Sequence, residues 1–117
     1  MGTPAKLLFV CTHNLSRSHT AQMMLLAQTA YEVRSAGTSV HAPVPLSAEL
    51  VAWADRLFVM EEHHAEHVRA RFAAVLGGRP LICLNIPDDF QPLAPDLVAI
   101  LRRRLAQHIA LPEQGTK

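Results

Sequence analysis

The segment that most constrains the fold is the apolar run at residues 7–10, which ends at Cys11 and leads into a polar turn. Arg17 and Ser18 close this turn, and a helix-like segment begins at His19. A buried strand, a tight turn and a helix in that order point backbone N–H groups and a helix N-terminus at one small volume, which binds an anion. The same partial positive charge favours a nucleophilic thiolate, and an arginine fork grips two phosphate oxygens. The segment therefore predicts attack by Cys11 on phosphorus, against the alternative of a buried structural cysteine before an ordinary turn.

Strand and helix patterns alternate along the rest of the chain. Apolar or alternating runs predict strands at residues 6–10, 31–36, 56–60 and 81–84, and helical patterns predict helices at 19–30, 47–54, 61–76 and from 95 onward. We therefore expect a three-layer α/β/α domain with a four-stranded parallel sheet. This single domain should span residues 1–111, followed by a frayed tail at 112–117.

Composition excludes several classes of protein. Half of the 117 residues are hydrophobic and 18% are charged, as in a globular domain. A net charge of +1 argues against nucleic acid or an acidic membrane as a partner, and no apolar run reaches the roughly 18 residues that span a bilayer. Two cysteines, one of them in the predicted site, indicate a reducing compartment. We expect a cytoplasmic protein, and the oligomeric state stays open.

A second candidate group follows the fourth predicted strand. Phosphoryl transfer from an alcohol or phenol needs an acid that protonates the leaving oxygen, and Asp88 and Asp89 lie where such an acid is required. In a parallel α/β sheet the carboxyl ends of strands share one edge, so these carboxylates should lie near Cys11. The pattern alone also fits a polar turn.

The pattern Cys11-x-x-Asn14-x-x-Arg17-Ser18, at the end of the first strand, resembles the phosphate loop of low-molecular-weight protein tyrosine phosphatases. We call residues 11–18 the phosphate loop. The stretch Ser35-Ala36-Gly37-Thr38 resembles the segment after the second strand of the same family. Pro87-Asp88-Asp89-Phe90 is similar to the family's Asp-Pro-aromatic acid motif.

The resemblance implies a compact member of the family that hydrolyses phosphomonoesters through a phosphocysteine intermediate, without cofactor or metal. Protein phosphotyrosine is the favoured substrate, and a small phosphomonoester is the alternative. Its implied catalytic residues are Cys11, Arg17 and Asp88, with Asp89 as the reserve acid and Phe90 as a candidate wall against a substrate ring. The phosphate would be bound by Thr12, His13, Asn14, Leu15, Ser16, Arg17 and Ser18.

Within the phosphate loop, Asn14 tolerates left-handed backbone and should rigidify the turn. The resemblance implies that Ser18 donates its hydroxyl to the thiolate, and capping of the following helix is the alternative. The sequence also departs from the family. His13 stands where many members have glycine, and Ser16 replaces a second cysteine. Residues 37–45 contain no aromatic side chain, and no loop-supporting histidine is evident near Ser47.

Other functions remain as alternatives. A phosphate- or phosphoprotein-binding module would need neither the thiol nor the acid. An arsenate reductase would need resolving cysteines, and only Cys83 is left, which we expect to pack inside a strand. His63 and His67 have the spacing of paired metal ligands, with Glu66 nearby, but no third ligand is identifiable and we expect no metal.

Overall fold

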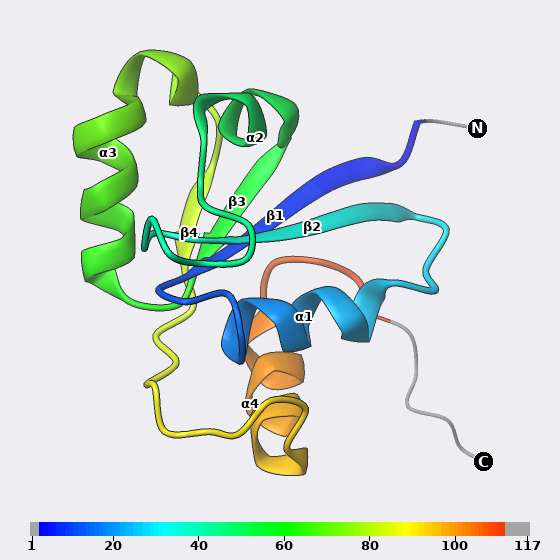
Figure 1. Ribbon diagram of the computed structural model, residues 1–117. Coiled ribbons are helices and arrows are strands. Elements are labelled where there is room, and N and C mark those ends of the chain that lie inside the picture. The colour runs from blue at the N-terminus through cyan, green and yellow to red at the C-terminus, as the bar shows by residue number, and fades with distance from the viewer. Residues whose placement is uncertain (1–2, 112–117) are drawn as a thin grey trace.

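The computed structural model describes residues 3–111, which form a four-stranded parallel sheet between two layers of helices (Figure 1). The strands are β1 (Ala5–Cys11), β2 (Tyr31–Gly37), β3 (Arg56–Val59) and β4 (Leu81–Cys83), in the order β2-β1-β3-β4. Because β1 pairs with β2 on one side and β3 on the other, the topological switch point lies at the carboxyl end of β1, which is Cys11. The predicted fold class is confirmed.

The helices form one layer on each face of the sheet. Helices α1 (Arg17–Leu25) and α4 (Pro95–Leu105) cover one face, and α2 (Ala48–Trp53) and α3 (Glu62–Leu76) cover the other (Figure 1). Successive residues of β1 therefore enter opposite cores: Leu7 and Phe9 pack toward α1 and α4, whereas Leu8 and Val10 pack toward α2 and α3. Burial on both faces explains why the run at residues 7–10 is apolar without alternation.

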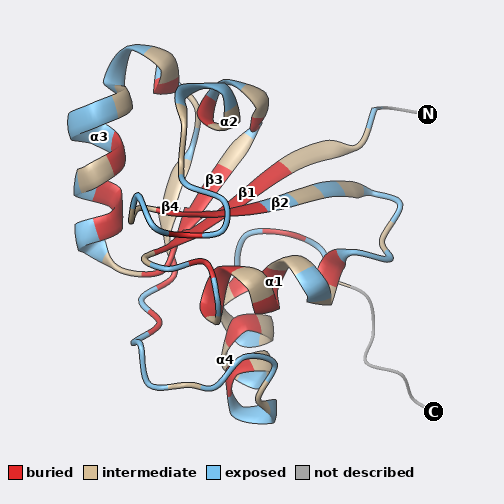
Figure 2. Cartoon of the chain, viewed as in Figure 1, coloured by how far each residue is buried: buried red, intermediate tan, exposed pale blue. Residues whose placement is uncertain are grey.

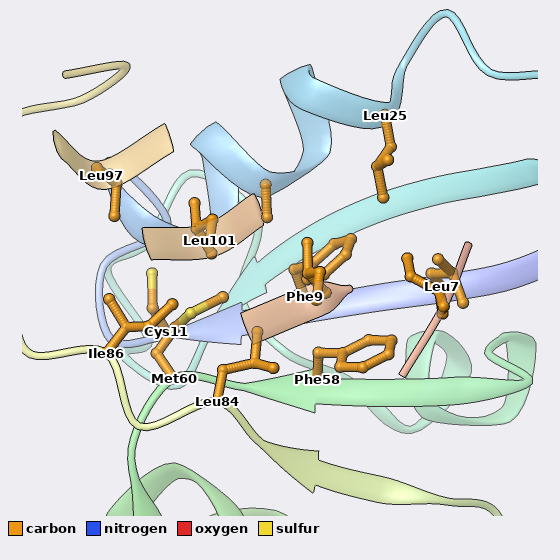
Figure 3. Packing of buried hydrophobic residues seen from close by; sticks show 13 residues of the cluster. Leu7, Phe9, Cys11, Leu25, Phe58, Met60, Leu84, Ile86, Leu97 and Leu101 are labelled. Carbon is orange, nitrogen blue, oxygen red and sulfur yellow. The ribbon is translucent and has the colours of Figure 1, made fainter. Parts of the chain in front are cut away.

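The core beneath α1 and α4 supports the predicted site. Leu97 and Leu101 of α4 lie over the sheet, and Cys11, Met60 and Ile86 sit at one end of this cluster (Figure 3). Burial is concentrated on the middle strands and on the inner faces of the helices (Figure 2). The thiol is thus held at the end of a buried central strand and packs against this core.

Two local predictions are wrong in detail. Helix α1 ends at Leu25 instead of residue 30, and Leu26 is 56% exposed. The carbonyl of Ala30 already accepts a hydrogen bond from Ala5 at the sheet, so the preceding residues must reverse the chain. The prediction that Cys83 packs as a core thiol in the fourth strand holds only in part: Cys83 lies in β4 and packs against the core beneath α2 and α3, but it stays half-buried because β4 is an edge strand. The tail at residues 112–117 lies outside the described residues.

Within residues 3–111, no helix is long and apolar enough to cross a bilayer.

Candidate active site

The phosphate loop leaves β1 at Cys11 and enters α1 at Arg17. Asn14 adopts a φ of 60°, and the N–H groups of Thr38 and Ser39 donate to the carbonyls of Cys11 and Thr12, at 2.8 and 3.0 Å. Two carbonyls of the phosphate loop are thus hydrogen-bonded by the segment that follows β2. None of the backbone N–H groups of residues 12–16 donates a hydrogen bond to the part of the chain that the structure describes. These donors are available to an anion.

The thiol of Cys11, the predicted nucleophile, lies at the bottom of this loop. Cys11 is 3% exposed, and its Sγ lies 3.0 Å from Oγ of Ser18. Asn14 Nδ2 donates to the same Ser18 oxygen at 2.9 Å, so the hydroxyl hydrogen of Ser18 is left to donate elsewhere. Its two acceptors are the Cys11 sulfur and the Ala36 carbonyl, which is farther away at 3.5 Å. The Ser18 hydroxyl is thus placed to donate to the Cys11 sulfur.

Arg17 is held in place by groups that the sequence analysis did not connect to it. Its side chain is only 2% exposed, and Nη1 donates to the Glu61 carboxylate and to the Ile86 carbonyl. The hydrogen bond from Arg17 holds the pKa of Glu61 below its usual range. Nε and Nη2 of Arg17 make no hydrogen bond to residues 3–111, and Nε lies 3.9 Å from the Asp88 carboxylate. One edge of the guanidinium is therefore free for a bidentate contact with phosphate.

A histidine supports the loop, but it comes from α3 and not from the region of Ser47. His64 is fully buried; its Nδ1 accepts from the Glu61 N–H at 3.0 Å, and its Nε2 lies 2.9 Å from Thr12 Oγ1. Burial, followed by the charges of His63 and Arg17, lowers the pKa of His64 to about 3. The bond from His64 to the N-cap amide of Glu61 has the geometry of a capping box, but nothing local in the sequence indicated that the same ring reaches Thr12.

The predicted catalytic residues meet at one small pocket. Its volume is about 100 Å³, a few times the volume of a water molecule, and thus suited to one tetrahedral oxyanion. Asp88 is 62% exposed and lies at this pocket. The pocket is lined by Cys11, Thr12, His13, Leu15, Ser16, Arg17 and Asp88.

Four predicted site residues lie outside the pocket wall. Asn14 and Ser18 are buried behind the loop, where they support Cys11. Asp89 is exposed to solvent. Phe90 packs against the core beneath α1 and α4, and its carbonyl accepts a hydrogen bond from Ser16 at 2.9 Å. The structure thus places Asp88, and not Asp89 or the Phe90 ring, at the pocket that Cys11 lines.

A larger and mainly apolar pocket adjoins the first. It has a volume of about 530 Å³ and shares Leu15, which is 57% exposed, with the anion pocket. Its apolar walls come from the loop after β2, from α2 and from the segment before α4. These wall residues are Pro43, Val44, Leu50, Pro92 and Leu93.

The ligand atoms of Glu61, His63 and His64 lie within 4.8 Å of one another. Both ring nitrogens of His64 are already hydrogen-bonded, and Glu61 is paired with Arg17. A cation at this point would have to displace contacts that hold the phosphate loop. This cluster therefore does not fit a metal site, and His67 is not part of it.

Two points raised by the sequence, the replacement of a family glycine by His13 and the possible pairing of Cys83 with Cys11, have simple structural outcomes. The loop needs its positive φ at Asn14, and His13 does not adopt one. Cys83 lies on β4, which is separated from β1 by β3. Two strand spacings amount to about 10 Å, too far for a disulfide with Cys11 without backbone movement.

No protein-family model and no curated protein matches the chain. Several solved structures do. YwlE arginine phosphatase from Geobacillus stearothermophilus is 24% identical with a TM-score of 0.66, over 89% of this chain and 92% of that one. The low-molecular-weight protein tyrosine phosphatase SP-PTP from Streptococcus pyogenes is 13% identical with a TM-score of 0.72, over 91% of this chain and 94% of that one. A YwlE mutant from Bacillus subtilis is 22% identical with a TM-score of 0.67, over 88% and 97%.

The chain therefore has the fold of the low-molecular-weight protein tyrosine phosphatases, and the resemblance seen in the sequence is confirmed for the fold.

Proposed function

We propose that the protein is a cysteine-dependent phosphatase that hydrolyses phosphomonoesters, with protein phosphotyrosine as its substrate. The observation that carries this proposal is the convergence of four groups on one pocket of oxyanion size. These are the Cys11 thiol, the free edge of Arg17, the free N–H groups of residues 12–16, and the Asp88 carboxyl. Binding alone would require neither a thiol nor an acid.

In the first step, the Cys11 thiolate attacks phosphorus in line with the ester oxygen. The S–P bond forms as the P–O bond breaks, and Asp88 gives its proton to the leaving oxygen. Arg17 and the loop N–H groups hold the three equatorial oxygens and their developing charge. In the second step, Asp88 takes a proton from water, which attacks phosphorus. The S–P bond then breaks, releasing inorganic phosphate and the thiolate.

The shape of the site favours an aryl phosphate. Cys11 lies at the bottom of the pocket, so a long, flat leaving group reaches it better than a short one. Leu15 offers an apolar surface at the rim, where a tyrosine ring would pack, and the larger apolar pocket continues beyond it. Solved relatives include an arginine phosphatase, so phosphoarginine is the natural competing substrate to compare. We also place the enzyme in the cytoplasm, because a reducing compartment keeps free cysteines such as Cys11 and Cys83 reduced.

The test is hydrolysis of an aryl phosphate between about pH 5 and 8 by the wild type and by Cys11→Ser. Loss of the nucleophile should reduce turnover by roughly three orders of magnitude or more, with the circular dichroism spectrum unchanged. Rapid quenching of the wild type should trap phosphate on Cys11. Activity of Cys11→Ser within about threefold of the wild type would contradict the mechanism. A folded wild type that binds vanadate without turnover would instead be an anion-binding module.

A further inference from the structure

Thr12 carries a hydroxyl at the anion pocket that the proposed mechanism does not use. Thr12 is one of the residues that line the pocket, and its Oγ1 lies 2.9 Å from Nε2 of His64. No other hydrogen bond is made by this hydroxyl within residues 3–111. The question is which of the two partners donates.

The contacts of His64 decide the direction of this hydrogen bond. A backbone N–H can only donate, so the Glu61 N–H bonded to Nδ1 requires that this nitrogen carry no proton. A neutral imidazole must then carry its proton on Nε2, which donates to Thr12 Oγ1. Burial keeps His64 neutral by lowering its pKa to about 3. The hydroxyl hydrogen of Thr12 therefore points away from His64.

We propose that His64 fixes the Thr12 hydroxyl as a hydrogen-bond donor to an oxygen of the bound phosphoryl group. Thr12 is then a binding residue by its side chain as well as by its backbone, and His64 is a positioning residue that acts through it. The arrangement parallels Asn14 and Ser18, where a nitrogen donor directs a hydroxyl at Cys11. The inference rests on the proposed function only in taking a phosphate-like anion as the ligand.

The first experiment measures the affinity of the protein for inorganic phosphate and vanadate by calorimetry. Thr12→Val keeps the shape of the side chain and removes the hydroxyl, whereas Thr12→Ser keeps the hydroxyl. A hydrogen bond to a charged group predicts roughly tenfold to a hundredfold weaker binding by Thr12→Val and near-wild-type binding by Thr12→Ser. Wild-type affinity in Thr12→Val would overturn the proposal.

The second experiment separates the positioning role of His64 from simple support of the loop. In His64→Asn the shorter side chain can still accept from the Glu61 N–H, but it no longer reaches Thr12. His64→Asn should weaken phosphate binding in the wild type and have no further effect in Thr12→Val. Equal losses in both backgrounds would mean that His64 acts on the loop backbone and not through the hydroxyl.

These binding measurements require no turnover, so the proposed function and the proposed role of Thr12 can be disproved independently of each other. A protein that binds phosphate through Thr12 but hydrolyses no phosphomonoester would overturn the proposed function and leave this inference standing. Turnover and phosphate binding that are both unchanged in Thr12→Val would overturn this inference alone. A wild type that binds neither phosphate nor vanadate would overturn both.

Discussion

The carboxylate of Glu61 pairs with Nη1 of Arg17, although 44 residues separate them in the chain. Glu61 follows β3, the strand beside β1, so the sheet itself brings the acid to the loop. The Ile86 carbonyl, beyond β4, binds the same nitrogen at 2.7 Å. Arg17 is therefore oriented by the segments that follow β3 and β4, which leaves its other edge for an anion.

Replacing Glu61 by Gln should weaken the site, because it removes the charge that orients a buried guanidinium. We expect kcat/KM for an aryl phosphate to fall about tenfold or more. The free energy of unfolding should fall by about 1 kcal/mol, since Glu61 is one-third exposed and solvent screens the pair. Glu62→Gln is the control: Glu62 is exposed in the same helical turn, and the substitution changes the net charge equally. Equal kinetics in the two variants would argue against the orienting role of Glu61.

Asp88→Asn should lose activity according to the leaving group. A general acid matters most when the departing oxygen is strongly basic, so alkyl phosphates should lose about 100-fold or more in kcat and activated aryl phosphates much less. Asp89→Asn, the neighbouring substitution of the same size, should change either substrate less than about threefold, because Asp89 does not line the pocket. A leaving-group dependence that follows Asp89 instead would reassign the acid.

Gly37 leaves no room for a side chain beneath the phosphate loop. A methyl group at this position would lie 2.5 Å from the Thr12 carbonyl oxygen and 2.6 Å from Ala42 Cβ. Gly37→Ala should therefore displace the loop, with about 1–3 kcal/mol of lost stability and weaker phosphate binding. Thermal unfolding with and without phosphate measures both effects. Gly78→Ala, which would meet no atom within 4 Å, should leave both unchanged.

His64 should make stability depend on pH below neutrality. Burial lowers its pKa from 6.5 to about 3; the charges of His63, Arg17 and His67 act in the same direction, and Glu61 opposes them. Below about pH 6.5 the unfolded chain takes up a proton that the folded chain does not. Stability should therefore fall as the pH drops from about 6.5 toward 3, by at most about 1.4 kcal/mol per pH unit.

Urea unfolding at pH 7 and pH 5 tests this contribution of His64. The wild type should lose about 1–2 kcal/mol more between these pH values than His64→Asn, which has no titrating ring. His63→Asn serves as the control, because His63 is exposed and should retain most of the wild-type pH dependence. A His64→Asn variant with the wild-type pH dependence would show that other groups cause it.

The elements of this fold could be predicted because their signals are local. Burial on both faces requires an unbroken apolar strand, and the four-residue spacing of Leu97, Leu101 and Leu105 requires one buried helical face. The phosphate loop could also be predicted from the sequence, because the thiol, the left-handed Asn14 and the arginine follow one another within seven residues. The end of α1 could not be predicted in this way, because it depends on where the chain after the helix joins the sheet.

The sequence by itself determined which residues could do the chemistry, namely Cys11, Arg17 and an acid after the fourth strand. Only the tertiary structure decided how they are held and which of the two acids lines the pocket with Cys11. The partners Glu61 and His64 lie 44 and 52 residues from Arg17 and Thr12, and strand order brings them together. Strand order arises from how the whole chain packs its two cores, and no local pattern of residues encodes it.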